Sequence, residues 1–152
     1  MNDRRSRMRS RPRWWLAAGQ AVVLLPVVRS MLWLRGYTST MRLLQAGSRV
    51  EPSSTATASV PEAVAEVASA VTTVASVIPL RTRCLARSIT IWWMSGRRGH
   101  SVEVVLGVTR PDGGRLPAHA WVEYRGIPVN DTADVRTRFI VMPWPPLGGR
   151  GR

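Results

Sequence analysis

One cysteine, two histidines and a few acids are the residues whose types could support nucleophilic catalysis in this chain. Such chemistry requires a thiolate, an imidazole that takes and returns a proton, and a polar group that fixes the imidazole tautomer. Cys84 is the only cysteine, and the histidines are His100 and His119. A lone cysteine excludes an internal disulfide and a cysteine-rich zinc site, and it suits a reducing compartment. Cys84 is therefore a candidate nucleophile.

The neighbourhood of Cys84 in the sequence favours a reactive thiol. The residue is expected at the N-terminus of a helix over about 84–95, with Arg81, Arg83 and Arg87 close by. Both the helix dipole and positive charge favour the thiolate. The backbone N–H of Cys84 is also a natural oxyanion donor, whereas a second donor is not evident. The alternative is a buried cysteine that acts as a small apolar side chain.

A predicted hairpin brings a carboxylate beside His119. A three-residue loop at 124–126, with glycine last, would join two strands and pair Glu123 with Ile127. The same register sets His119 directly opposite Asp131 on one face of the sheet, within reach of its side chain. The sequence therefore predicts that Asp131 orients the imidazole of His119.

This inference depends on the turn type. A two-residue loop at 125–126 would shift the register by one and turn Asp131 to the other face. Asn130 and Asp134 would then be the substitutes, because an amide can also orient an imidazole, and Asp131 would be a turn or cap residue. Trp121 is expected on the same face as His119, where it either shields the imidazole from water or is a plain core aromatic. His100 is expected in a solvated turn.

The elements that must position these residues form an α+β pattern. A stripe of Val64, Val67, Val71, Val74 and Ile78 predicts a helix over 61–78 with its apolar face in the core. Alternating residues and turn signals indicate strands. The expected strands lie at about 102–109, 118–124, 127–131 and 139–142.

The N-terminal third differs in charge and composition. All 22 basic residues of the chain are arginines, and residues 1–49 hold ten of them against one acid, a net charge of +9 out of +13. Apolar helices are expected over about 14–34 and 38–47, separated near Gly36. The uncharged run at 14–28 is shorter than the roughly 20 residues of a membrane span. The two helices could lie on a membrane surface, pack on the catalytic domain or dock a partner, and the sequence does not decide among these. Charge of this sign also attracts nucleic acid.

Several of these segments resemble one family. The segments are Arg83-Cys84-Leu85-Ala86-Arg87-Ser88-Ile89, Arg97-Arg98-Gly99, Leu106-Gly107-Val108, Ala118-His119-Ala120-Trp121-Val122-Glu123 and Val129-Asn130-Asp131. Their order and spacing resemble the transglutaminase-like leader peptidases of lasso peptide biosynthesis, over roughly residues 61–142. The departure is Trp92-Trp93 in the helix of the cysteine, where aliphatic residues are more usual.

The resemblance implies a papain/transglutaminase-like core, with helices packed on a small antiparallel sheet and an N-terminal helical arm. Composition along the chain gives the divisions, which are an arm at 1–49, a linker at 50–60, the peptidase domain at 61–142 and an irregular tail at 143–152. The implied activity is removal of the leader from a ribosomally made precursor peptide by a triad of Cys84, His119 and Asp131. Trp121 and Arg87 are the expected contacts to substrate or partner.

The resemblance also implies partners. They are the precursor peptide, a separate winged-helix leader-binding protein and an asparagine-synthetase-like cyclase. No metal, other cofactor or nucleic acid is expected, and the implied location is cytoplasmic, with membrane contact through residues 14–47. Two alternatives stay open: acyl transfer to an amine, as in a transglutaminase, and a basic membrane or nucleic-acid adaptor without catalysis.

Overall fold

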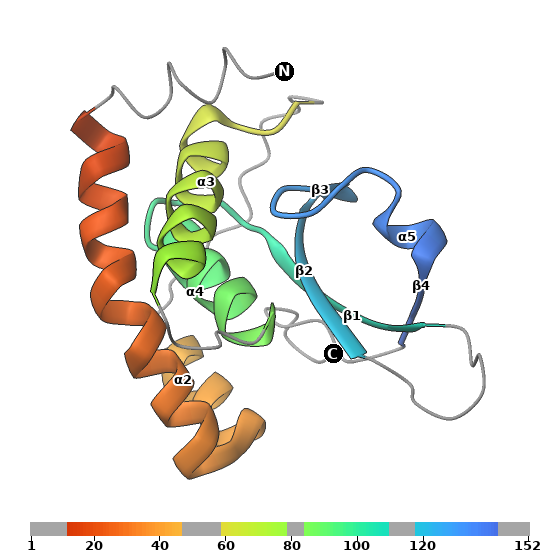
Figure 1. Cartoon of the computed structure of the whole chain (residues 1–152), viewed down its shortest axis with the longest axis horizontal. Coiled ribbons are helices and arrows are strands. Elements are labelled where there is room, and N and C mark those ends of the chain that lie inside the picture. The colour runs from red at the N-terminus through yellow and green to blue at the C-terminus, as the bar shows by residue number, and fades with distance from the viewer. Residues whose placement is uncertain (1–11, 47–58, 79–83, 110–117, 143–152) are drawn as a thin grey trace.

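The computed structural model describes residues 12–46, 59–78, 84–109 and 118–142, and Figure 1 shows how their elements are arranged. The helices are α2 (Pro12–Ala46), α3 (Glu62–Val77), α4 (Cys84–Gly96) and α5 (Val135–Arg138). The strands are β1 (Glu103–Thr109), β2 (Ala118–Tyr124), β3 (Ile127–Pro128) and β4 (Phe139–Val141). The predicted linker lies almost entirely, and the predicted tail wholly, outside the described residues.

Helices α3 and α4 lie where the sequence predicts them. In α3, the valines of the apolar stripe are buried, and Pro61 stands directly before the first helical residue, a place where proline's fixed φ suits a helix start. Cys84 is the first residue of α4, so the thiol does stand at a helix N-terminus. Both placements are confirmed.

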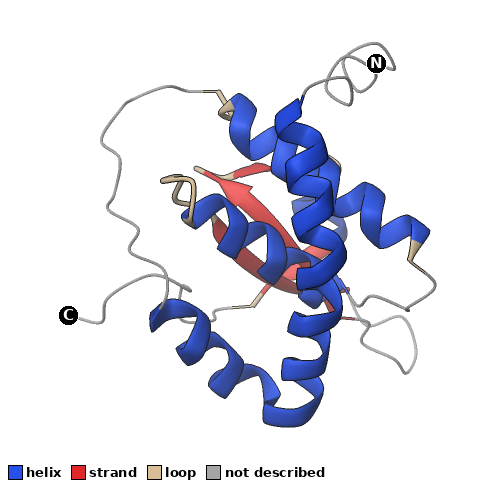
Figure 2. Ribbon diagram, turned by 90° about the vertical axis from the view of Figure 1, so that its left-hand side faces the viewer, coloured by secondary structure: helices blue, strands red, loops and turns tan. Residues whose placement is uncertain are grey.

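The four strands form one antiparallel sheet in the order β3-β2-β1-β4. Strands β1 and β2 pair along most of their length, with Gly107 opposite His119. Viewed from the helical side in Figure 2, the sheet lies behind the helices. The expected α+β class, with helices packed on a small curled antiparallel sheet, is confirmed.

Helix α4 lies between the sheet and the other long helices. It contacts β2 and β1, while α2 and α3 pack on α4 and on each other. One face of β2, made of Ala120, Val122 and Tyr124, is buried towards this helical side. Its other face carries His119, Trp121 and Glu123, since alternate residues of a strand point to opposite faces. The helical layer therefore leaves the second face of β2 to other elements.

Helix α2 is more closely integrated than the expected arm. The helix breaks at Gly36, where φ is 71° and ψ is 176°, as the sequence predicts. Its first part, however, places Trp14, Ala21 and Leu25 in the same apolar cluster as the valines of α3. An apolar stripe with the spacing of a helix can be buried against the domain or exposed, and sequence pattern alone does not distinguish these cases. The first third of the chain thus contributes to the core.

The hairpin between β2 and β3 differs from the predicted one. Tyr124 pairs with Ile127 across a two-residue turn in which Arg125 and Gly126 have φ values of 49° and 79°. Positive φ at both central positions is the type I′ turn, whose twist matches that of the flanking strands. The three-residue loop and its register are therefore wrong. Strand β3 is also shorter than expected and ends at Pro128.

Candidate active site

The central contact of the candidate site joins His119 and Asp131. The Nε2 atom of His119 lies 2.5 Å from Oδ2 of Asp131. The side chains are 21% and 13% exposed, so both are mostly buried yet open to the surface at one side. The predicted proximity of the two residues is present, although the register from which it was inferred is wrong.

Asp131 reaches the imidazole because the chain leaves the ladder after Pro128. The backbone N–H of Val129 still donates to the carbonyl of Val122, at 2.9 Å, but residues 129–131 then bend. The side chain of Asn130 takes over as acceptor for the N–H of Val122, at 2.7 Å. Strand alternation no longer fixes the direction of the Asp131 side chain beyond this bend. The shifted register therefore does not turn the carboxylate away.

The carboxylate of Asp131 is held in its charged form. Burial raises the pKa of Asp131, but the hydrogen bonds from His119 and from the backbone N–H of Thr132 outweigh it, and the net pKa is lowered. The Thr132 N–H donates to Oδ1 at 2.8 Å, and Arg138 donates to the same oxygen at 2.7 Å. An anionic carboxylate accepts a hydrogen bond from the imidazole and fixes its tautomer.

Helix α5 supplies a second arginine to the same strand face. Arg136 donates to both carboxylate oxygens of Glu123, at 2.8 and 2.6 Å, and Trp121 donates its indole N–H to Oε1 at 2.7 Å. Glu123 is only 1% exposed, and its hydrogen bond raises the pKa of Arg136. A buried carboxylate needs such partners. The two arginines of α5 thus hold two carboxylates along one edge of the site.

The sequence interpretation did not find Arg136 and Arg138. Four residues are too few for a helical period to be visible, so α5 gave no signal in the pattern. The alternation of His119, Trp121 and Glu123 could have indicated a polar face in need of cations. This alternation could not have identified Arg136 and Arg138 as those cations.

Aromatic rings enclose the imidazole. The ring of Phe139 lies 4.8 Å from that of His119, and the ring of Trp121 lies 6.0 Å from it, both nearly parallel to it. Gly107 leaves room for these rings, because a Cβ atom there would lie 2.9 Å from both the Phe139 Cβ and the Trp121 Cζ3. Trp121 is fully buried. Its position fits shielding of the imidazole rather than direct contact with a substrate.

Helix α4 is attached to β2 close to His119. Ser88, which is buried, donates its hydroxyl to the carbonyl of Ala120 at 3.0 Å, and Asn130 donates to the Ser88 oxygen at 3.4 Å. Cys84 stands one helical turn before Ser88, a rise of about 6 Å. In Figure 1 the first turn of α4 and the beginning of β2 lie towards the same lower side of the molecule. The thiol is free and partly exposed.

Cys84 and His119, both within the described residues, are not hydrogen-bonded to each other in this structure. Catalytic hydrogen bonds are commonly long without substrate and shorten when substrate binds. The Nε2 atom of His119 is occupied by Asp131, which leaves Nδ1 as the nitrogen that can exchange a proton with a thiol. The structure therefore joins two of the three predicted residues directly and places the third on the adjoining helix.

The other candidates lie as follows. Asn130 binds backbone and Ser88, so it fastens the bend instead of orienting the imidazole. Asp134 is exposed and pairs with Arg138.

Arg87 is half-buried with its Nε atom unpartnered among the described residues, and its contact with substrate stays a prediction. His100 lies just after the turn that follows α4, near the expected place. Over the described ranges, no group of three or more His, Cys, Asp or Glu could hold a metal ion.

A comparison with protein families matches residues 21–143 to the family described as Transglutaminase-like superfamily. This range covers most of the chain, and the chain belongs to the transglutaminase-like superfamily. Members are in general cysteine proteases or acyltransferases, which indicates a cysteine peptidase or acyl-transfer type of activity for this domain. The match begins within α2, in keeping with the packing of that helix in the core. Comparisons with curated proteins and with solved structures gave no match.

Proposed function

We propose that this chain is a cysteine peptidase that removes the leader from a ribosomally made lasso precursor peptide. The observation that carries the proposal is the His119 imidazole, held through Nε2 by Asp131 beside the helix that begins with the only cysteine. The order and spacing of the motifs around Cys84 and His119 support the lasso substrate, because they resemble the leader peptidases of that pathway.

The chemistry follows from the three groups. His119 Nδ1 takes the proton of the Cys84 thiol, and the thiolate forms a bond to the carbonyl carbon of the scissile peptide. As the tetrahedral intermediate collapses, the carbon–nitrogen bond breaks and the protonated imidazole gives its proton to the leaving amine. Water activated by His119 then hydrolyses the thioester, which releases the leader acid and restores the thiol. Asp131 stabilises the imidazolium at each protonated stage.

The surrounding residues position the three groups for these chemical steps. The α4 dipole favours the thiolate at the first residue of the helix. Arg138 and the Thr132 N–H hold the Asp131 carboxylate, so its other oxygen stays directed at the imidazole. Phe139 and Trp121 limit the access of water to the ring, and the exposed edge is left for the thiol and the substrate.

The test is incubation of the full chain with a candidate lasso precursor peptide and its leader-binding protein, followed by mass spectrometry. We expect a leader fragment that has gained the mass of one water. A new amide on that fragment would instead indicate acyl transfer to an amine, the second activity found in this superfamily.

Two variants make the test specific. Cys84→Ala should abolish cleavage while leaving association with the leader-bound partner intact, and His119→Ala should lower the rate by a factor of about 100 or more. The matched control is His100→Ala, which removes the other histidine and should leave cleavage unchanged. Full turnover by Cys84→Ala would exclude the mechanism.

A further inference from the structure

The outward half of the first part of α2 is apolar although nothing in the described structure covers it. With 100° between successive residues, the side chains of one half of this helix point into the core and those of the other half point outward. Trp33 is 82% exposed and Leu16 is 69% exposed. The other exposed apolar residues of this outward face are Trp15, Val22, Val23, Val27 and Leu34. Gln20 and Ser30 are its polar members.

Such a face is unusual for a water-exposed helix, which normally carries charged and polar side chains on its outer side. Within Pro12–Gly36, an 18-residue window has a mean hydropathy of 1.5, and the helix has the length of a membrane span, a test that core helices and signal sequences also pass. A core helix would be mostly buried, whereas only 28% of the residues in this window are buried. The opposite half, with Trp14, Ala21 and Leu25, packs on α3 and α4, so lipid cannot surround the helix.

Positive charge accompanies the apolar face. Arg13 and Arg29 lie at its margins, Arg35 follows its last residue, and five further arginines stand in residues 1–11 of the sequence. Trp15 and Trp33 lie near the two ends of the face, about 27 Å apart along the helix. Tryptophan and arginine at the borders of an apolar surface are typical of segments at the interface between lipid and water.

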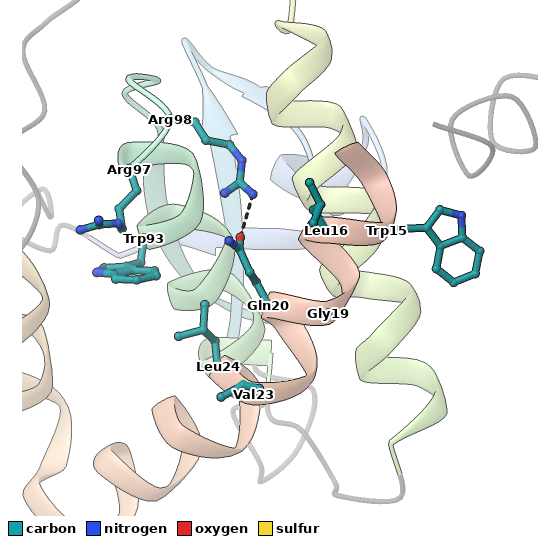
Figure 3. A pocket seen from close by; sticks show the side chains of 9 residues that line it. All are labelled: Trp15, Leu16, Gly19, Gln20, Val23, Leu24, Trp93, Arg97 and Arg98. Atoms are coloured by element: carbon teal, nitrogen blue, oxygen red, sulfur yellow. Dashed lines mark hydrogen bonds between the residues drawn. The ribbon is translucent and has the colours of Figure 1, made fainter. Parts of the chain in front are cut away.

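A groove of about 680 Å³ continues the face towards the end of α4 (Figure 3). Its walls include Leu16, Val23 and Trp93, and at α4 Arg98 donates to Gln20 at 2.8 Å. Arg97 is exposed, with its guanidinium carbon 5.3 Å from the centre of the Trp93 ring. An apolar channel bordered by an exposed arginine suits an acyl chain and the phosphate of its headgroup.

We propose that the outward face of α2 binds the surface of a bilayer that contains anionic lipids, with the helix parallel to the membrane plane. A second copy of the chain is a poorer occupant, because a symmetric dimer through this face would bring together two segments that each carry +9. Nucleic acid would satisfy the arginines but leave the valines and tryptophans exposed. An anionic bilayer pairs with the arginines through its headgroups and covers the valines and tryptophans with its acyl chains.

The experiment is co-sedimentation of the full chain with vesicles of phosphatidylcholine, alone or mixed with phosphatidylglycerol. We expect binding to the mixed vesicles and little to the neutral ones, because the arginines are attracted by anionic headgroups. Val23→Glu should weaken binding by a factor of about ten or more, since it places a charge in the lipid-facing surface. Val23 is 63% exposed, so its replacement should not disturb the core.

The matched control is Val77→Glu at the end of α3, where the same substitution falls on a valine that is 76% exposed. This variant should bind vesicles like the unchanged protein. Equal losses in both variants, equal binding to neutral vesicles, or no binding at all would overturn the proposal. A lipid-free dimer in sedimentation equilibrium that Val23→Glu converts to monomer would assign the face to a second copy instead.

Discussion

The two carboxylates on one face of β2 and its following bend have similar partners but different surroundings. Glu123 is 1% exposed, and Arg136 and Trp121 together satisfy both of its oxygens. Asp131 accepts from Arg138 on one oxygen and presents the other to His119, near the surface. In the Arg136–Glu123 ion pair, the closed pair, both carboxylate oxygens have their partners, so this pair can only stabilise the fold. The Arg138–Asp131 pair, the open pair, holds the imidazole of His119, which can change its protonation state as catalysis requires.

The largest expected effect is on the closed pair. Arg136→Ala removes the cation from the buried Glu123 carboxylate and should lower the free energy of unfolding by about 3 kcal/mol. Urea unfolding followed by circular dichroism measures it. Arg35→Ala, an exposed arginine on α2, is the control and should change stability by less than about 0.5 kcal/mol. Equal stability of the two variants would show that the Glu123 pair is not structural.

A somewhat smaller effect is expected at Gly107, which lies opposite His119 on strand β1. Gly107→Ala places a Cβ 2.9 Å from the Cβ of Phe139 and from the ring of the fully buried Trp121, the two aromatic residues beside the imidazole. Overpacking of this kind costs about 1–3 kcal/mol. The same variant should also lower the cleavage rate, since the rings that hold His119 must shift. Unchanged stability and rate would mean that the sheet accommodates the methyl group.

The open pair should respond in activity more than in stability. Arg138→Ala leaves Asp131 with the Thr132 N–H, and the exposed arginine contributes at most about 1 kcal/mol. We expect cleavage to slow by about fivefold with almost no change in urea midpoint. The reverse result, a large loss of stability with full activity, would make Asp131 the structural carboxylate of the two.

The smallest effect is on the pH dependence of stability. The pKa of Asp131 is lower in the folded chain than its ordinary value. Its contribution to stability is therefore complete above the unfolded pKa, about 3.9, and disappears as the pH falls through the folded value. The difference in unfolding midpoint between the unchanged chain and Asp131→Asn should be present at pH 6 and shrink below about pH 4. A difference that grows on acidification would contradict this sign.

The sequence predicted the elements of the fold better than it predicted the contacts between them. The apolar stripe of α3, the start of α4 at Cys84 and the break at Gly36 all arise from local signals: period, charge and glycine. The two-residue turn at 125–126 was the alternative and not the preferred prediction, and in it Arg125 adopts a left-handed φ that arginine seldom has. The twist of the whole hairpin favours that conformation over the residue's own preference.

The candidate site shows the same division. The His119–Asp131 pair followed from the order of the residues, yet it forms through a bend that no periodicity describes. The partners of the two carboxylates lie on α5, seven residues beyond Asp131 in one case and thirteen beyond Glu123 in the other. Ion pairs at such separations depend on how the chain returns to the sheet. They are visible in the structure and not in the sequence.

Alkylation of Cys84 by iodoacetamide at neutral pH tests the central claim most directly. Because the chain has one cysteine, intact-mass spectrometry reports that residue alone, and the measurement needs no substrate. If His119 and Asp131 serve the thiol, His119→Ala should slow alkylation by about tenfold or more, whereas His100→Ala should leave it unchanged. Equal rates in the unchanged chain and in both histidine variants would separate the thiol from the imidazole and contradict the account.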